Sequence, residues 1–184
     1  MQIFIMRHGE AASIVAEDSL RPLTKIGLLE TEKMGLWLAR RKLTLIKVFV
    51  SPFLRAQQSC ANVTAAIQKT TMSDEIIPET LDFITPSGNA RQVHDFIDGL
   101  FHSIDSLNKE SNSDESNSYE NSNESQAILF VSHMPFVSYL VGELTGTTNM
   151  PIFSTGGIAI IDYDIEQMQG QLIDMVSPAR VHVK

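Results

Sequence analysis

The chain has few cysteines, no long apolar run and no basic excess, and each of these absences excludes a class of protein. Cys60 is the single cysteine among 184 residues, which excludes an internal disulfide framework and a cysteine-rich zinc site. No apolar run approaches the ~20 residues that cross a bilayer, and Met1 is followed by neither a basic leader nor a small-residue cleavage site. We therefore expect a cytoplasmic protein with no membrane partner.

Lysine and arginine total 14 against 22 acidic residues, and the formal net charge is −8 at pH 7. This excess repels phosphate backbones and argues against a nucleic-acid partner. Five of the acidic groups lie in residues 110–126, ESNSDESNSYENSNESQ, which contain no Lys or Arg and offer almost nothing apolar to bury. We therefore expect residues 1–184 to form a single domain with a disordered Ser/Asn/Glu-rich insertion at about 103–126.

Short apolar runs alternate with longer amphipathic stretches in the rest of the chain. In the first amphipathic stretch we expect Thr24 to cap a helix and Leu29, Leu36 and Trp37 to share its buried face. The runs with the length and composition of strands are Gln2–Met6, Lys47–Val50, Glu75–Pro78, Ala127–Val131, Gly157–Tyr163 and, at an edge, Gln171–Val176. The helical candidates are Thr24–Arg41, Phe53–Gln68, Ala90–Phe101 and Pro135–Thr145. This alternation predicts an α/β three-layer sandwich with a mostly parallel (mixed) sheet and helices on both faces.

Basic side chains follow three of the predicted strands at the point where each strand ends. Arg7 and His8 follow the first strand, Arg55 lies in SPFLRA after the second, and His133 lies in SHMP after the strand at Ala127–Val131. Because ligands bind at the carboxyl ends of the strands in such sheets, we expect these four side chains to converge there. A lone arginine or histidine is more often a surface or structural residue, but the joint occurrence favours a functional site.

Two arginines and two histidines without a carboxylate cluster favour a phosphoryl group over a metal ion. Zinc needs three or four protein ligands, and guanidinium groups among them would repel it, so we expect no metal and no cofactor. Guanidinium forks pair with phosphate oxygens, and helix N-termini add N–H donors. A neutral imidazole attacks phosphorus well when its Nδ1–H donates to a backbone carbonyl. We expect Gly9 to present that carbonyl through unusual dihedral angles, and the second histidine, if cationic, to neutralise the transferring oxygens.

The stretches IMRHGEA, RPLTKIG, VSPFLRAQQS and VSHMPFVSYLVGEL resemble the histidine phosphatase superfamily, also called the phosphoglycerate mutase-like family. Within it, the chain is similar to the phosphohistidine phosphatases of bacterial phosphorelays. The resemblance implies that His8 is the phosphorylated nucleophile, that Arg7 and Arg55 bind phosphate, and that His133 completes the pocket. It also makes Arg21, in RPLT, a candidate substrate-binding residue, with a surface role as the alternative.

The chain departs from the larger members of this family, which carry a helical lid over the pocket. The span 79–91, ETLDFITPSGNAR, is too short for such a lid, so we expect an open pocket that admits a phosphorylated side chain of another protein. Glu79 is a candidate general acid, with a helix-start or solvent role as the alternative. An imidazole leaving group needs little help from an acid, because its conjugate acid has a pKa of about 6.5.

The expected function is that of a monomeric, metal-independent phosphohistidine phosphatase with a covalent intermediate on His8. Its expected partner is a phosphorylated signalling protein, a histidine phosphotransfer domain of a phosphorelay. Two alternatives stay open. One is a broad phosphomonoesterase acting on phosphoserine, phosphotyrosine or small metabolites, and the other is a noncatalytic phosphate-binding module.

Overall fold

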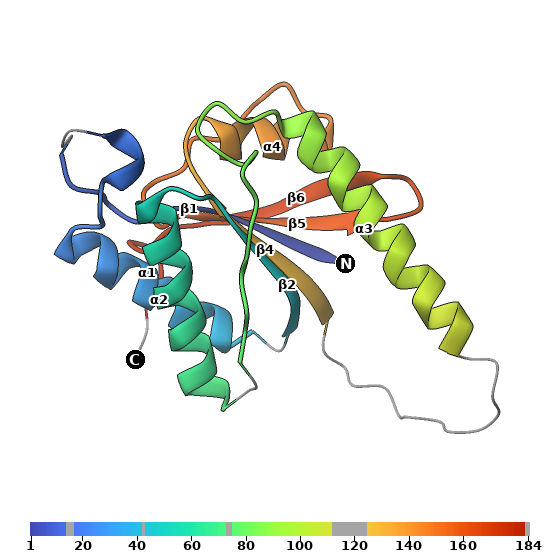
Figure 1. The fold of residues 1–184 in the computed structure, drawn as a ribbon, viewed down its shortest axis with the longest axis horizontal. Helices are drawn as coiled ribbons and strands as arrows, with labels where there is room; N and C mark the ends of the chain where they lie inside the picture. The colour runs from blue at the N-terminus through green and yellow to red at the C-terminus, as the bar shows by residue number, and fades with distance from the viewer. Residues whose placement is uncertain (14–16, 42, 73–74, 112–124, 183–184) are drawn as a thin grey trace.

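The computed structural model describes residues 1–13, 17–41, 43–72, 75–111 and 125–182, and within them a six-stranded sheet lies between pairs of helices (Figure 1). The strands are β1 (Gln2–Arg7), β2 (Leu43–Val50), β3 (Glu79–Thr80), β4 (Ser125–Ser132), β5 (Ile158–Asp164) and β6 (Gln169–Val176). The helices are α1 (Lys25–Ala39), α2 (Leu54–Thr71), α3 (Ala90–Ser111), α4 (Phe136–Thr145) and the short 3-10 helix η1 (Asp18–Leu20). None of the helices in these ranges has the length and apolar character of a membrane span.

The strand order places the two strands that carry the histidines next to each other. The sheet runs β3-β2-β4-β1-β5-β6, with β1 to β4 parallel, β5 antiparallel to β1, and β6 antiparallel to β5. Arg7 at the end of β1 is in register with Ser132 at the end of β4. The carboxyl ends of the two central strands therefore coincide, and the predicted α/β class with a mixed, mostly parallel sheet is confirmed.

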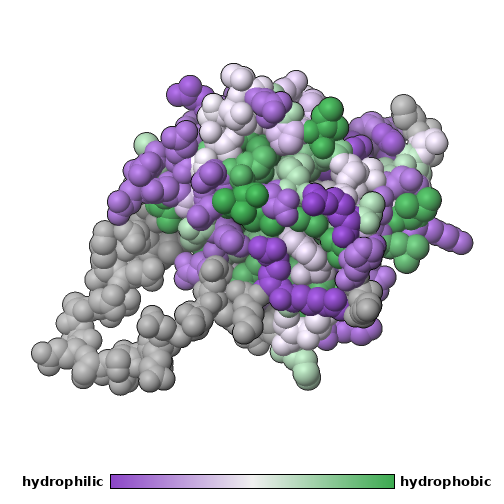
Figure 2. All heavy atoms as spheres, turned by 180° about the vertical axis from the view of Figure 1, so that it is seen from behind, coloured by the Kyte–Doolittle hydropathy of each residue, from purple (hydrophilic) through white to green (hydrophobic). Residues whose placement is uncertain are grey.

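Alternating residues of the central strands form two hydrophobic cores. Ile3 and Ile5 face the core that includes α3 and α4, while Phe4 and Met6 face the core that includes α1 and α2, as the helix pairs in Figure 1 suggest. All four side chains are fully buried. Burial on both faces explains why β1 is a continuous apolar run rather than an alternating one. On the outer surface, hydrophobic residues occur in small groups among hydrophilic ones in the view of Figure 2.

Helix α1 begins as predicted but buries a different face. The Thr24 hydroxyl accepts the N–H of Gly27 at 3.1 Å, which confirms the cap. The predicted buried face is wrong, since Leu29 is exposed. A Cβ at Gly35 would lie 2.7 Å from the Cβ of Ala66, so α1 packs on α2 through small residues that hydrophobicity alone does not single out. The buried residues of α1 are Gly27, Thr31, Met34, Gly35 and Leu38.

The strand predicted at Glu75–Pro78 is wrong. Strand β3 consists only of Glu79 and Thr80, which pair with Phe49 and Val50 of β2. Pro78 has no N–H to donate to a ladder, and the preceding residue of the run, an isoleucine, is 78% exposed. The apolar run therefore lies outside the sheet, at its edge.

Helix α3 is longer than predicted. It continues past Phe101 to Ser111, and β4 begins at Ser125, so both ends of the segment expected to be disordered, 103–126, belong to regular elements. The sequence explains the extension, because apolar residues at 93, 97, 100, 104 and 107 keep the three- and four-residue steps of one helix face. The remainder of the predicted insertion, residues 112–124, lies outside the described residues.

Candidate active site

His8 leaves β1 with its imidazole fixed in one tautomer. Its backbone N–H donates to the Ser132 carbonyl at 2.9 Å, which holds the residue against β4. The ring Nδ1 lies 2.7 Å from the Gly9 carbonyl oxygen, and Nε2 lies 3.2 Å from Nε of Arg55. A ring nitrogen approaches a carbonyl as a donor, so Nδ1 carries the proton and Nε2 presents its lone pair. The carbonyl contact predicted for a nucleophilic imidazole is therefore present.

Gly9 allows close packing and does not adopt an unusual backbone angle, so the prediction of unusual dihedral angles at Gly9 is wrong. The described glycines with positive φ are Gly146 and Gly156. A Cβ at Gly9 would lie 2.5 Å from the Gly27 carbonyl oxygen and 2.9 Å from Cγ2 of Thr31. The chain after β1 therefore touches the backbone of α1, and only a residue without a side chain fits there.

His133 follows β4 and lies beside His8, with ring centroids 5.0 Å apart. Its Nε2 is 2.7 Å from Oγ of Ser51, which also accepts the N–H of Phe53 at 3.4 Å. Nε2 is the one acceptor that the described contacts offer to the hydroxyl proton of Ser51, which favours donation to Nε2 and places the proton of His133 on Nδ1. That nitrogen is buried, with no hydrogen-bond partner among the described residues. The Nδ1–H group of His133 is therefore a buried donor without a described acceptor.

Both imidazoles are held neutral. Burial, and to a lesser extent the positive charge of Arg55, lowers the pKa of His8 to about 4, although the hydrogen bond to Gly9 opposes this. Burial and the neighbouring His8 lower the pKa of His133 to about 3. At neutral pH His8 is therefore uncharged, as a nucleophilic imidazole has to be. In the free protein His133 is also neutral, so the cationic role considered for it is replaced by that of an N–H donor.

Arg7 supplies a second buried donor without a partner. Its Nη1 donates to the Phe153 carbonyl at 2.7 Å, whereas its Nε is buried and unpaired within the described part of the chain. Burial lowers the pKa of this guanidinium, and the charge of Glu30 opposes the effect. Because β1 and β4 are adjacent and in register, the unpaired nitrogens of Arg7 and His133 belong to neighbouring strand ends. Two buried N–H groups without acceptors fit an anionic ligand.

Arg55 lies in the first turn of α2 and is 4% exposed. Its Nη1 donates to the Asp18 carbonyl oxygen at 2.6 Å and its Nη2 to the Asp18 carboxylate at 3.0 Å. The Phe53 ring lies 5.0 Å from the guanidinium carbon. Arg55 is therefore fixed beside His8 by contacts on all three of its nitrogens.

The structure brings Arg21 to the edge of this cluster. Its Nη1 donates to the Asp18 carboxylate at 2.9 Å and its Nε to the Ala12 carbonyl at 2.8 Å. Its charge also contributes to lowering the pKa of His8. Asp18 thus links Arg21 to Arg55, a connection that the sequence reasoning missed.

The structure does not bring Glu79 into the cluster. Its carboxylate lies 3.9 Å from Nζ of Lys47 and is 54% exposed. No hydrogen bond or ion pair among the described residues joins it to either histidine. Ser51 lies in the motif SPFLRA, and the position of a hydroxyl at a strand end is the signal in the sequence that it can orient a nearby imidazole.

The donor set fits an anion. Within the described ranges, no three His, Cys, Asp or Glu side chains are grouped so that they could hold a metal ion. The site instead presents guanidinium groups and imidazole N–H groups, which are donors to oxygen. Such a set can bind a phosphoryl group and place it against Nε2 of His8.

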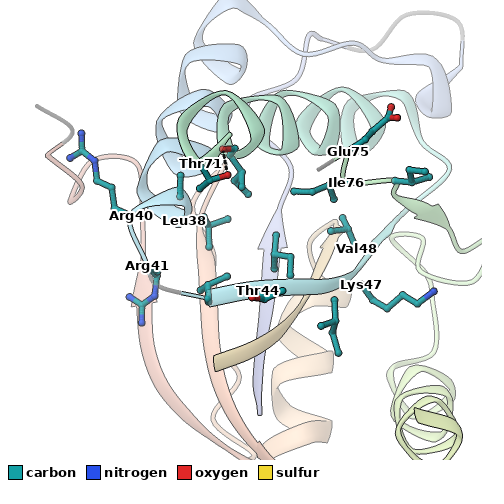
Figure 3. Close-up of a pocket in the computed structure, with 15 residues that line it drawn as sticks. Leu38, Arg40, Arg41, Thr44, Lys47, Val48, Thr71, Glu75 and Ile76 are labelled. Atoms are coloured by element: carbon teal, nitrogen blue, oxygen red, sulfur yellow. Dashed lines mark hydrogen bonds between the residues drawn. The ribbon is translucent and has the colours of Figure 1, made fainter. Parts of the chain in front are cut away.

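A separate groove lies at the opposite end of the sheet (Figure 3). Its volume is about 600 Å³, and it is formed by the start of β2, the last turns of α1 and α2, and residues 75–77. Leu38, Val48 and Ile76 line it, while Arg40 and Lys47 point outward in Figure 3. It contains none of the predicted site residues, so the groove and the histidine pair are different features.

Comparisons with known proteins agree with this geometry. The model of the histidine phosphatase superfamily (branch 1) matches residues 3–80. Phosphohistidine phosphatase SixA of Escherichia coli (strain K12) is 36% identical over 182 residues, covering 98% of this chain and 96% of that protein. A SixA homolog of Haemophilus influenzae is 32% identical and covers 89% of each chain. The solved structure of SixA complexed with tungstate has a TM-score of 0.79 at 34% identity, covering 97% of this chain and 98% of that one. The chain, with its paired histidines at the ends of adjacent strands, therefore belongs to the histidine phosphatase superfamily.

Proposed function

We propose that residues 1–184 form a single phosphatase domain that removes the phosphoryl group from phosphohistidine on a protein. The observation that carries this proposal is the orientation of His8, a neutral imidazole whose Nε2 lone pair lies against Arg55 Nε, next to the ring of His133. Arg7 Nε and His133 Nδ1 are buried donors without described acceptors. Similarity to proteins named phosphohistidine phosphatase, one of them solved with the oxyanion tungstate, supports the proposal.

The phosphoryl group binds first, as an anion. Its oxygens accept the unpaired N–H groups of Arg7 Nε and His133 Nδ1, together with N–H groups of Arg55 and Arg21 that are not taken by the hydrogen bonds of the described residues. Buried donors that are already in place cost little reorganisation when charge spreads over the oxygens in the transition state.

Transfer then takes place in two displacements. Nε2 of His8 forms a bond to phosphorus while the bond from phosphorus to the substrate imidazole breaks. That ring carries a proton on its other nitrogen, so the electron pair of the broken bond stays on the departing nitrogen and a neutral imidazole leaves. Arg55 Nε, which meets Nε2 in the free protein, moves its hydrogen bond to the ligand. Water next attacks phosphorus, the bond to Nε2 breaks, and inorganic phosphate leaves with neutral His8 restored.

Among the described residues, no hydrogen bond or ion pair joins a carboxylic acid to His8 or His133, which favours an imidazole leaving group. Asp18 is the carboxylate that contacts the site arginines, and its hydrogen bond from Arg21 lowers its pKa, so it stays ionised and cannot donate a proton. Glu79 is paired with Lys47 instead. A departing imidazole can do without an acid, whereas an alkoxide cannot. This argues against the broad phosphomonoesterase.

The surroundings of the pocket suit a protein partner. The connection between β3 and α3 is only residues 81–89, which leaves no room for a helical lid. Leu20, two residues after Asp18, is 58% exposed, and Ile152, next to the residue whose carbonyl accepts from Arg7, is 87% exposed. Exposed apolar residues beside a site are suited to contact another protein. The proposed partner is a phosphorylated signalling protein, a histidine phosphotransfer domain. The proposed enzyme is a monomer in the cytoplasm.

The test offers phosphohistidine and phosphotyrosine side by side to the purified protein, with EDTA present. We expect fast release of phosphate from phosphohistidine only, and a trapped protein label that is acid-labile and alkali-stable. The label should disappear in His8→Ala and persist in His182→Ala, a variant at an exposed histidine. Equal rates on both substrates would support the phosphomonoesterase, and phosphate binding without turnover would support the binding module. A label retained by His8→Ala would refute the mechanism.

A further inference from the structure

The loop between β1 and α1 closes on itself and carries η1 to the site. The N–H of Ala12 donates to the Pro22 carbonyl at 2.8 Å, and Ala11 forms a bridge with Leu23. Arg21 Nε donates across the loop to the Ala12 carbonyl at 2.8 Å. The loop is therefore braced at its base, and its short helix contacts α2, which carries Arg55 in its first turn.

Asp18, at the start of η1, makes three contacts with the site arginines. One carboxylate oxygen accepts from Arg21 at 2.9 Å and the other from Arg55 at 3.0 Å, while its backbone carbonyl accepts from Arg55 at 2.6 Å. The side chain of Asp18 is 50% exposed, whereas that of Arg55 is 5% exposed. A half-exposed carboxylate thus bridges the guanidinium groups of Arg21 and Arg55.

These contacts determine where the guanidinium of Arg55 lies. Of its five N–H groups, one on Nε meets His8, and one on each outer nitrogen is taken by Asp18. One N–H on each outer nitrogen remains for a ligand. Without Asp18, the guanidinium of Arg55 would be oriented by its hydrogen bond to His8 and by its contact with the Phe53 ring.

The same carboxylate competes with a bound anion. Its negative charge lies against the two arginines that the phosphoryl group needs, so it weakens the attraction of the pocket for any anion. A substrate has a protein body that adds contacts of its own, but the inorganic phosphate left after hydrolysis has none. The charge of Asp18 therefore acts most strongly on the product.

We propose that Asp18 is a positioning residue that holds Arg55 against His8 and, through its charge, promotes the release of inorganic phosphate. The second part rests on the proposed function, because phosphate is a product only if the protein is a phosphatase. The first part rests on the geometry of the arginines alone.

The test uses the full chain with Asp18→Asn, which keeps the shape and one acceptor oxygen but removes the charge. We expect its affinity for inorganic phosphate, measured by calorimetric titration, to rise about tenfold. We expect its single-turnover rate of transfer to His8 to fall about tenfold, because Arg55 loses one of its anchors. Glu17→Gln is the matched control: it removes the same charge one residue earlier on the same loop, where the carboxylate accepts from Ser19. It should change neither quantity.

The two quantities move in opposite directions, which a purely structural role would not produce. A parallel loss of phosphate affinity and transfer rate would overturn the proposal, and so would an Asp18→Asn protein that matches Glu17→Gln in both. Circular dichroism and thermal unfolding show that each variant is folded before it is compared. The titration needs no substrate, so it tests Asp18 even if the unmodified protein hydrolyses no phosphohistidine, an outcome that would refute the proposed function instead.

Discussion

Replacing Arg55 with alanine should slow phosphoryl transfer and move the loss of activity in acid to higher pH. Arg55 is 4% exposed, and its Nε lies 3.2 Å from Nε2 of His8. The substitution removes donors to the ligand. It also removes a positive charge that lowers the pKa of His8 and opens the site to water, which weakens the effect of burial.

The two effects have different magnitudes. Losing one preorganised donor to the oxygens of a transition state costs a factor of about 10²–10³ in rate, or ~2.7–4 kcal/mol. With a pKa of about 4, roughly 1% of His8 is protonated at pH 6, whereas about three quarters would be protonated at the ordinary value of 6.5. A protonated Nε2 cannot attack phosphorus, so a higher pKa of His8 makes the variant lose activity at a higher pH.

The assay follows kcat/KM from about pH 4 to about pH 8 and the titration of the His8 ring by NMR. Arg41→Ala is the control, since that guanidinium stacks 4.9 Å from the Trp37 ring at the other end of the sheet and should leave both curves unchanged. An unchanged rate would refute the contact between Arg55 and the ligand. A slower rate with an unmoved pKa of His8 would refute the electrostatic coupling between the two side chains.

Three further predictions test other parts of the site. Ser51→Ala removes the hydroxyl that fixes the tautomer of His133, so transfer should slow by about tenfold or more while the ¹⁵N shifts of that ring show mixed tautomers. Gly9→Ala places a Cβ 2.5 Å from a carbonyl oxygen of α1, so it should lower the free energy of unfolding, measured in urea, by about 1–3 kcal/mol. Gly99→Ala is the control and should not lower it, because nothing lies within 4 Å of the added Cβ. The free energy of unfolding should also fall as the pH drops from about 6.5 to about 4, because His8 and His133 take up protons more readily in the unfolded chain. Urea titrations at several pH values measure how steeply the free energy of unfolding changes with pH. A double variant with asparagine at both positions should reduce this dependence.

The convergence of four basic side chains at one edge of the sheet could be predicted because strand ends are readable from a sequence. Each of Arg7, His8, Arg55 and His133 comes directly after an apolar run or in the first turn of the helix behind it. Parallel pairing then brings these ends to one edge of the sheet, whatever the detailed packing. The class of fold followed from the same alternation.

The errors lie where tertiary packing decides. Gly35 is buried in α1 while Leu29 is exposed, because the close approach of α2 selects small residues there. The contact of Asp18 with Arg55 could not be predicted, because the path of the loop between β1 and α1 depends on hydrogen bonds across the loop and not on its local sequence. Its position three residues before Arg21 was a readable hint of an ion pair. The extension of α3 could also have been predicted from apolar residues at three- and four-residue spacing. The polar composition of the segment favoured disorder instead.

The register of β1 on β4 has a wider consequence. The two imidazoles follow neighbouring central strands, so their separation is set by the backbone ladder between Arg7 and Ser132 and not by any loop. If the proposed function holds, chemistry and target recognition belong to separable parts of the molecule. Grafting a new connection between β3 and α3, or between α4 and β5, should retarget the catalyst toward a different protein while its reactive centre is inherited unchanged.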